Sequence, residues 1–273
     1  MDQEVTTERR IAVLGGGNLG TALAWGWARA GLASSASIHI TRRHPEKLEA
    51  FAAQGFRVGA DNRAAIAECD VIVLAVQPQQ LDALLEEIAP DIDSRRHRVV
   101  SVVSGAEIAH LVAALPSGTS VVRAMPNTAV SIGESMTCLS APDGAEDALD
   151  EAVELFDAVG ATLTIREEMM IPATALCACG VAFFLRCIRA ASQGGIEIGF
   201  HPEEALLLAG QTARGAAALS LLEGTHPEAE IDRVTTPRGC TIAGLNEMEH
   251  QGLSSALIKG LIVSAKAAGE LYE

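Results

Sequence analysis

Apolar residues in the first 165 positions of the chain form short runs, separated by stretches with helical spacing. Such runs are typical of buried strands, and the stretches between them are typical of amphipathic helices. The predicted strands are 11–14, 37–40, 71–76, 99–103, 120–123 and 161–165, and the predicted helices are 21–30, 46–54, 81–88 and 107–115. This alternation predicts an α/β fold, a doubly wound parallel sheet with helices on both faces.

The pattern changes at about residue 167, after which helical stretches follow one another with almost no strand candidates. These stretches are 170–192, 202–223 and 242–271, rich in Ala, Leu and Gly. We interpret residues 1–167 as one domain and 168–273 as an all-helical domain. Apolar helices with so few aromatic residues are expected to pack against a second copy of the chain. The long apolar stretch 173–191 contains Arg186 and Arg189, so we predict a buried helix there rather than a membrane span.

Composition narrows the range of partners. The formal net charge of −15 argues against nucleic acid, because neutralising phosphates requires clustered Lys and Arg. The first ten residues are polar and lack the apolar core of a signal peptide, so we expect a cytoplasmic protein whose six cysteines are free thiols. Cys177 and Cys179 are too closely spaced for a zinc knuckle, and we predict no metal site.

A glycine-rich loop follows the first predicted strand. Gly15, Gly17 and Gly20 supply the pattern G-x-G-x-x-G, with Asn18 and Leu19 between the last two glycines. The first glycine permits a tight turn, the second lets backbone approach a pyrophosphate, and the third lets helix and strand pack closely. The loop therefore predicts that residues 1–167 form a Rossmann-type NAD(P)-binding domain.

The end of the second predicted strand carries Arg42 and Arg43 where NAD-specific sites usually have an acid. Two guanidinium groups suit a 2′-phosphate, so we predict NADP, with NAD as the alternative. Ala75, Val76, Gln77 and Pro78 follow the central strand, and ligands bind at such carboxyl ends in open α/β sheets. These four residues are expected to border the cofactor.

A second candidate site begins at residue 235, where the sequence reads Thr-Thr-Pro-Arg-Gly-Cys-Thr before an apolar helical run. Thr before Pro, and Gly soon after, are signals for a turn and a helix start. The first turn of a helix has unpaired N–H groups and partial positive charge, which suit a small carboxylate or phosphate.

Four segments in this order resemble the pyrroline-5-carboxylate reductase family, which makes proline by passing a hydride from NAD(P)H to a cyclic imine. They are residues 15–20, 75–78, 123–128 (Arg-Ala-Met-Pro-Asn-Thr) and 235–241. The resemblance implies that the glycine loop holds the pyrophosphate, that Asn62 contacts the cofactor and that residues 75–78 line its nicotinamide side. It also implies dimers interlocked by the helical domains, often built into decamers, with the site formed between one subunit's nucleotide domain and its partner's helices.

For the substrate, the resemblance implies that backbone N–H groups of Gly239, Cys240 and Thr241 bind the carboxylate. The Thr241 hydroxyl would lie near the imine nitrogen as the catalytic group, and Thr236 and Arg238 complete the expected substrate site. A cyclic imine that arrives protonated needs a hydride donor, an anchor and orientation, but no strong base. A 2-hydroxy-acid dehydrogenase must remove a proton, and the sequence shows no His-Asp or Lys arrangement for that.

Three positions depart from the family pattern. Gln77 replaces a Lys, residues 177–181 (Cys-Ala-Cys-Gly-Val) replace Ser-Gly-Ser-Gly-Pro, and Arg238 replaces a Gly. If residue 238 has a positive φ, Arg is strained there. Its guanidinium either contacts the substrate carboxylate or points to solvent. The alternatives are therefore a reductase acting on another cyclic imino acid or a 3-hydroxy acid, and an NADP-binding paralogue with little or no activity.

Overall fold

A computed structural model describes residues 9–222 and 224–270 of the chain. Contacts divide the chain into two compact units. One unit runs up to Cys179 and resumes at Ser264, and the other is Gly180–Val263. The domain boundary between residues 167 and 168 stays a prediction.

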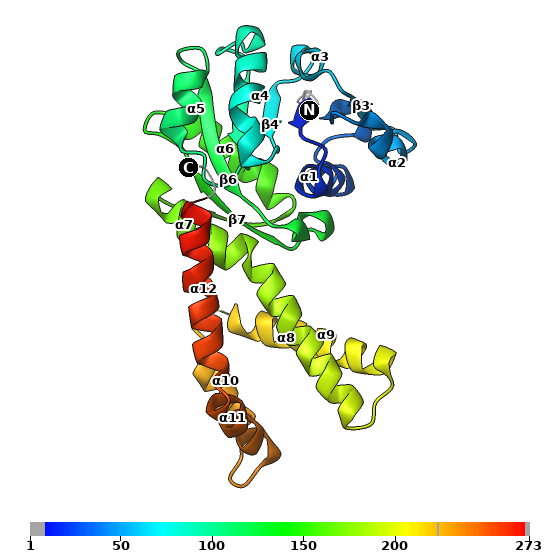
Figure 1. Ribbon diagram of the computed structural model, residues 1–273, viewed down its shortest axis with the longest axis vertical. Helices are drawn as coiled ribbons and strands as arrows, with labels where there is room; N and C mark the ends of the chain where they lie inside the picture. The colour runs from blue at the N-terminus through cyan, green and yellow to red at the C-terminus, as the bar shows by residue number, and fades with distance from the viewer. Residues whose placement is uncertain (1–8, 223, 271–273) are drawn as a thin grey trace, which may run out of the picture. The chain divides into compact units, whose positions relative to one another are not determined.

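The first unit is built on a sheet of eight strands among the described residues, in the order β3-β2-β1-β4-β5-β6-β7-β8 (Figure 1). The strands are β1 (Ile11–Leu14), β2 (Ile38–Thr41), β3 (Arg57–Gly59), β4 (Val71–Leu74), β5 (Arg98–Ser101), β6 (Ser120–Met125), β7 (Ser135–Ser140) and β8 (Gly160–Thr164). Every neighbouring pair is parallel except β6 and β7. The predicted α/β doubly wound sheet is confirmed, except that β7 and β8 run opposite to the other strands, because β7 pairs antiparallel with β6 and β8 pairs parallel with β7. The sequence pattern did not predict β7.

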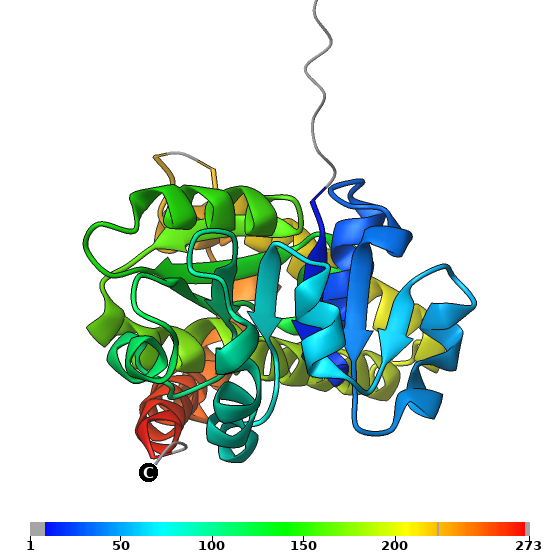
Figure 2. The same cartoon turned by 90° about the horizontal axis from the view of Figure 1, so that it is seen from above.

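Helices cover both faces of this sheet, as predicted. On β1, Ile11 and Val13 belong to one buried cluster, and Ala12 and Leu14 belong to another, because successive side chains of a strand point to opposite faces. The first cluster packs under α1 (Asn18–Arg29) and α6 (Glu146–Asp157), and the second under α3 (Asn62–Ala67), α4 (Leu81–Ile88) and α5 (Ile108–Ala114). Figure 2 shows α6 and the α4–α5 pair on opposite sides of the sheet.

One predicted helix of this unit differs from the structure, and one helix of the structure was not predicted. The helix predicted at 46–54 is a 3-10 turn, Pro45–Leu48, followed by the single turn of α2 (Glu49–Ala52). Helix α6 was not predicted, although its buried residues Ala148, Ala152, Leu155 and Phe156 follow helical spacing.

The last part of the first unit leads from the sheet toward the helical unit. A 3-10 turn at Glu167–Met169 precedes α7 (Met170–Ala173), which continues as a π-helix at Thr174–Ala178. Buried Arg123 of β6 donates from Nη1 to Glu167 Oε1 at 2.7 Å, and Ile108 N donates to the same oxygen at 2.6 Å. This carboxylate therefore joins the sheet, the start of α5 and the segment that follows β8.

The second unit is helical, as predicted. It contains α8 (Gly180–Glu197), α9 (Pro202–Ser220), α10 (Pro227–Arg233), α11 (Cys240–His250) and the greater part of α12 (Leu253–Gly269). Helices α8 and α9 form a closely packed pair, since a Cβ on Gly195 would lie 3.1 Å from the Ala205 Cβ (Figure 1). The helical stretch predicted at 242–271 is two helices, because Gly252 with φ +82° separates α11 from α12. Residue 271 lies outside the described residues, as does residue 223 at the end of the stretch predicted at 202–223.

The prediction that residues 173–191 form a buried helix is also wrong for the single chain. Side chains such as Phe184 and Leu185 are 62% and 58% exposed, and Leu206–Leu208 on α9 are exposed as well. Within the described residues, one stretch, Glu167–Glu197, has the length and apolar composition of a membrane-crossing helix. An apolar groove of about 760 Å³ also lies between α8 and α9, lined by Phe184, Ile188, Phe200 and Leu208 among others. A hydrophobic face of this size is typical of a surface that pairs with another chain.

Candidate cofactor and substrate sites

The turn between β1 and α1 depends on its glycines. Gly15 has φ +119°, and a Cβ there would lie 2.4 Å from the carbonyl oxygen of Ala75. A Cβ on Gly20 would lie 2.1 Å from the carbonyl oxygen of Gly15, whereas one on Gly17 would meet no atom within 4 Å. Gly15 and Gly20 thus allow the close packing of the turn, and Gly17 leaves its outer side open to a ligand.

The glycine loop presents the start of α1 to a cavity. Gly15 N and Gly16 N both donate to Thr41 O, at 3.2 and 2.7 Å, which fixes the loop on the end of β2. Gly17 is the N-cap and offers no side-chain capping bond, so the first N–H groups of α1 are suited to an anion. The cavity has a volume of about 360 Å³. It is lined by Gly15, Gly16, Gly17, Thr41, Arg42, Arg43, His44, Lys47, Ala60, Asn62, Ala75, Val76, Gln77 and Gln80.

Basic side chains gather at one end of this cavity, and no carboxylate is among the residues that line it. Arg42 Nη1 donates to Gly16 O at 2.9 Å, which ties it to the glycine loop. Arg43, His44 and Lys47 follow it in the chain and line the same space. Sequence reasoning missed His44 and Lys47, although their positions directly after the arginine pair could have indicated them. The charge at this end of the cavity favours a phosphate group.

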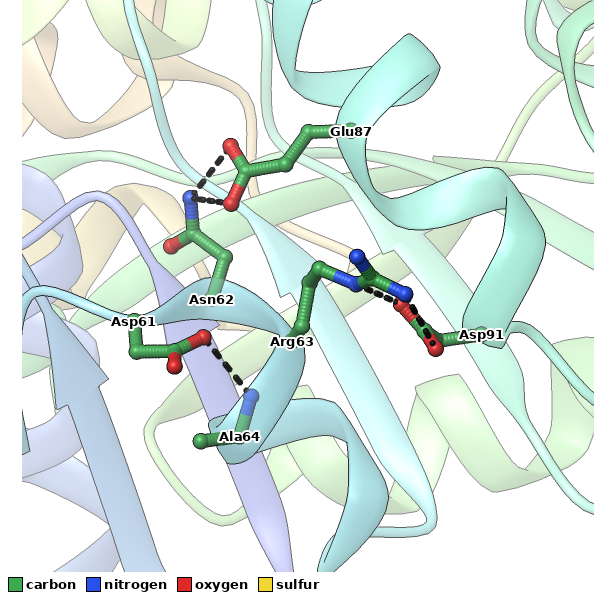
Figure 3. A network of polar contacts seen from close by, with 6 residues as sticks. All are labelled: Asp61, Asn62, Arg63, Ala64, Glu87 and Asp91. Atoms are coloured by element: carbon green, nitrogen blue, oxygen red, sulfur yellow. Dashed lines mark hydrogen bonds and ion pairs between the residues drawn. The ribbon is translucent and has the colours of Figure 1, made fainter.

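Asn62 lies at the start of α3, where two partners hold its amide. Its Oδ1 accepts a hydrogen bond from Thr41 Oγ1 at 2.6 Å. Its Nδ2 donates to the Glu87 carboxylate at 3.0 and 3.2 Å (Figure 3). Asp61 caps the same helix by accepting from Ala64 N at 2.9 Å, and Arg63 pairs with Asp91. Asn62 is therefore held in one orientation at the cavity wall.

A second hollow of about 490 Å³ adjoins the first, and shares Gly17, Arg42 and residues 75–77 with it. It is lined by Gly17, Asn18, Leu19, Arg42, Ala75, Val76, Gln77, Pro78, Val102 and Ser104. Val102 and Ser104 were missed by the sequence analysis, although they follow the carboxyl end of β5. The two hollows bring together every predicted cofactor residue except Gly20, which packs beneath the loop.

Residues 123–128 (Arg-Ala-Met-Pro-Asn-Thr) follow, in sequence, the residues that line the two hollows, and they precede the π-helix. Asn127 of this segment makes three hydrogen bonds within the fold. Asn127 N donates to Ser135 Oγ at 3.2 Å, and Asn127 Nδ2 donates to Cys177 O at 3.3 Å. Its Oδ1 accepts from Ala129 N at 2.9 Å. Asn127 thus ties the end of β6 to β7 and to the π-helix.

The predicted substrate residues form a turn and a helix start in the second unit. Gly239 N donates to Thr236 O at 2.9 Å, which closes a turn with Pro237 second and Arg238 third. Arg238 has φ 60° and is the one non-glycine residue with positive φ in the described part of the chain. Pro followed by a residue with positive φ is typical of a type II turn, which favours Gly at the third position. The strain expected at Arg238 is therefore confirmed.

Gly239 is also the N-cap of α11, so the turn leads directly into that helix. There is no side-chain capping bond and no acidic residue in the first turn of α11. A Cβ on Gly239 would lie 2.5 Å from Thr236 Oγ1, which explains the glycine. Cys240 is exposed and Thr241 half-buried. All five predicted substrate residues therefore lie at one helix N-terminus that is suited to a carboxylate.

Among the described residues, no group of three or more His, Cys, Asp or Glu side chains is arranged to hold a metal ion. The chemical features of the two sites are a dinucleotide groove with a basic end and an uncapped helix N-terminus.

Comparison with known proteins gives a consistent result. Residues 167–271 match the family model for pyrroline-5-carboxylate reductase dimerisation, and residues 10–105 match that for NADP oxidoreductase, coenzyme F420-dependent. Pyrroline-5-carboxylate reductase 1 of Dictyostelium discoideum is 47% identical over 96% of this chain, which spans half of that protein's length. Pyrroline-5-carboxylate reductase 2 of the same organism is 43% identical, covering 98% of this chain and 94% of the relative.

A solved structure supports the fold. The pyrroline carboxylate reductase of Plasmodium falciparum, with NADP bound, superposes with a TM-score of 0.88 at 22% identity, covering 97% of this chain and 98% of the other. The sequence matches extend over both units and include the helical half that the family uses for dimerisation. This chain belongs to the pyrroline-5-carboxylate reductase family.

Proposed function

We propose that this protein reduces 1-pyrroline-5-carboxylate to proline, the last step of proline biosynthesis, with NADPH as the reductant. One observation carries the proposal: a chain of this family has both a dinucleotide groove lined by basic residues and a helix that starts at Gly239 without a side-chain cap. The first suits NADPH, and the second suits the carboxylate of a small imino acid.

The groove fits NADPH in both of its halves. Gly15, Gly17 and the first N–H groups of α1 would hold the pyrophosphate, with Asn18, Leu19 and Gly20 completing the loop. Arg42 and Arg43, joined by Lys47, would bind the 2′-phosphate, and the fixed amide of Asn62 would contact the adenosine half. Ala75, Val76, Gln77 and Pro78 would line the nicotinamide half. NAD lacks the phosphate that this basic end favours, so it is the weaker alternative.

When bound, NADPH supplies a hydride, and the protein's part is to position the substrate. Backbone N–H groups of Gly239, Cys240 and Thr241 would bind the carboxylate, and the Thr241 hydroxyl oxygen would accept a hydrogen bond from the protonated imine nitrogen. Thr236 lies across the turn from Gly239 and would complete the substrate site. The guanidinium of the exposed Arg238 would contact the substrate carboxylate. Because the imine arrives protonated, orientation supplies most of the rate enhancement and no strong base is required.

The proposal extends to assembly and location. The exposed apolar side chains of α8 and α9 would be covered by a second copy in a homodimer, and five such dimers would form the decamer. Burial in the dimer would also explain why the stretch Glu167–Glu197 is apolar without requiring that it cross a membrane. We place the protein in the cytoplasm, with no nucleic-acid partner. Light scattering of the purified protein measures the mass that tests this arrangement.

A direct test supplies pyrroline-5-carboxylate with NADPH or NADH to the folded oligomer, and follows nicotinamide absorbance and proline formation together. We expect proline in a one-to-one ratio with oxidised cofactor and a higher kcat/KM with NADPH. Faster turnover of another cyclic imino acid or a 3-hydroxy acid would replace the substrate in this proposal. Tight NADPH binding with no turnover on any of them would indicate a paralogue that binds the cofactor without catalysis.

A further inference from the structure

Two thiols from distant parts of the chain meet beside the π-helix. Cys138 lies on β7 and Cys177 lies in the π-helix Thr174–Ala178, and their Sγ atoms are 3.8 Å apart. They belong to a small apolar cluster with Met125, Met170 and Ala173. Neither thiol has a part in the proposed reduction, so the contact is not explained by it.

The two thiols differ in their surroundings in a way that suits stepwise chemistry. Cys138 is buried, with 3% of its surface exposed, whereas Cys177 is half-buried. The hydrogen bond from Cys138 lowers the pKa of Cys177, and the same contact and burial raise the pKa of Cys138. Of the two thiols, Cys177 is therefore the one that more readily forms the thiolate, which reacts with oxidants, and the Cys138 thiol lies in contact with it.

The π-helix gives the backbone at Cys177 room to adjust. A disulfide needs the sulfur atoms to approach from 3.8 Å to about 2.05 Å. A π-helical turn holds one residue more than an α-helical turn closed at the same place, and such turns are often found at functional sites.

We propose that Cys138 and Cys177 are an oxidation site, a dithiol that hydrogen peroxide converts to an intramolecular disulfide. The Cys177 thiolate attacks one peroxide oxygen, so that an S–O bond forms, the O–O bond breaks and hydroxide leaves as water after taking up a proton. The Cys138 sulfur then attacks Cys177 Sγ, so that the S–S bond forms, the S–O bond breaks and the Cys138 proton leaves with the second water. Two thiols are oxidised by two electrons in total, and one peroxide is reduced to two waters.

The bond would link β7 to the last turn before the helical unit. Cys177 is two residues from the end of the first unit at Cys179, and its carbonyl accepts from Asn127 Nδ2 at 3.3 Å. The disulfide would hold this segment on the sheet, and it would divert Cys177 from irreversible oxidation, because a sulfenic acid captured by a neighbouring thiol cannot proceed to sulfinic acid. A dithiol reductant would restore both thiols.

The test uses the full-length protein, treated with a small excess of hydrogen peroxide and analysed by mass spectrometry. We expect the intact mass to fall by two hydrogen atoms and to return after dithiothreitol. Trypsin cleaves after Arg123, Arg166 and Arg186, so the bond would join peptide 124–166 to peptide 167–186. Because the second peptide also contains Cys179, fragmentation of the linked pair must place the bond at Cys177.

Three variants sharpen the result. Cys179→Ser, two residues away on the same segment, should keep the cross-link, and Cys177→Ser should abolish it. Cys138→Ser should leave a sulfenic acid on Cys177 that dimedone traps. A bond to Cys179, a bond between chains, or oxidation of exposed Cys187 and Cys240 with Cys138 left reduced would overturn the proposal. If Cys138→Ser does not fold, the peptide map of the unmodified sequence still decides the question.

Discussion

Arg238 has a strained backbone within the turn that we propose binds the substrate. Its φ of 60° lies in the left-handed region, which costs a non-glycine residue about 1 kcal/mol. The side chain is exposed. Such strain is typical of functional sites, which agrees with a role for the guanidinium in substrate binding.

Replacing Arg238 separates strain from side-chain chemistry. Arg238→Gly should relieve the strain, and the greater freedom of Gly in the unfolded chain should offset part of the gain. We expect Arg238→Gly to exceed Arg238→Ala in free energy of unfolding by a few tenths of a kcal/mol up to about 1 kcal/mol. Urea denaturation of both variants measures this difference. A clearly more stable Ala variant would show that residue 238 does not hold a positive φ.

Arg43 provides a test of cofactor choice at the same scale. It lines the basic end of the groove without the bond to the glycine loop that Arg42 makes. Arg43→Gln should raise the KM for NADPH about 10-fold, because roughly one charge-assisted hydrogen bond to the 2′-phosphate is lost. The KM for NADH should stay unchanged, because NADH has no such phosphate. Arg29→Gln, an exposed arginine at the end of α1, is the control. Equal effects on the two cofactors would place Arg43 outside the 2′-phosphate site.

His97 makes stability depend on pH. It is buried, Nδ1 accepts from Asp93 N at 3.0 Å, and Nε2 has no hydrogen-bond partner. Burial, and then the nearby Arg96, lower the pKa of His97 below 6.5 in the folded protein. Above pH 6.5 the imidazole is neutral in both states, and as the pH falls below 6.5 the unfolded state takes up the proton first. Folding stability should therefore fall from about pH 6.5 toward the folded pKa.

Denaturation curves at several pH values measure this slope. His97→Gln should flatten it, and His39, whose pKa is also lowered by burial, should account for the part that remains. A slope unchanged in both single variants and in the double variant would contradict the assignment.

At the scale of elements, the sequence pattern predicted most elements with periodic burial, α6 being an exception, and it failed where polar residues are buried. The strand at β4 and the helix α4 were predicted from clear apolar periodicity. Strand β7 contains Ser135, Thr137 and Ser140, all buried, so its polar composition hid it. Ser135 Oγ accepts from Asn127 N at 3.2 Å and lies 3.3 Å from Thr137 Oγ1 on the same strand. Asn127 follows β6, and no local pattern reveals that this segment lies beside β7.

Glu167 connects three elements, and its removal should show this. Glu167→Ala leaves the buried Arg123 guanidinium without its partner and Ile108 N without an acceptor, so we expect a loss of about 2–3 kcal/mol in free energy of unfolding. Glu168→Ala removes an exposed ion pair with Arg166 on the same turn and should cost less than about 0.5 kcal/mol. Thermal or urea unfolding compares the two, and equal losses would mean that Arg123 finds another partner.

At the scale of the whole molecule, the helical unit is incomplete as a single chain. Leu207 is 72% exposed on α9, beside other exposed leucines, and the family model for this region is named for dimerisation. Leu207→Glu should place a charge in the subunit interface and convert the oligomer to smaller species at micromolar concentration, as measured by analytical ultracentrifugation. Val112→Glu, an exposed apolar position on α5, is the matched control. An unchanged mass for Leu207→Glu would place the interface elsewhere.

The sequence by itself determined the α/β sheet, the glycine loop, the helical second half and the family, because each depends on local spacing or on a contiguous motif. It also indicated strain at Arg238, since a turn of that type has one position that prefers glycine. The tertiary structure decided what depends on distant residues coming together. Examples are the antiparallel pairing of β7 with β6, the addition of Lys47 to the basic residues that line the groove, the amide of Asn62 held by Thr41 and Glu87, and the contact of Cys138 with Cys177. These features arise from the packing of elements, and packing joins residues that no period or motif in the chain relates.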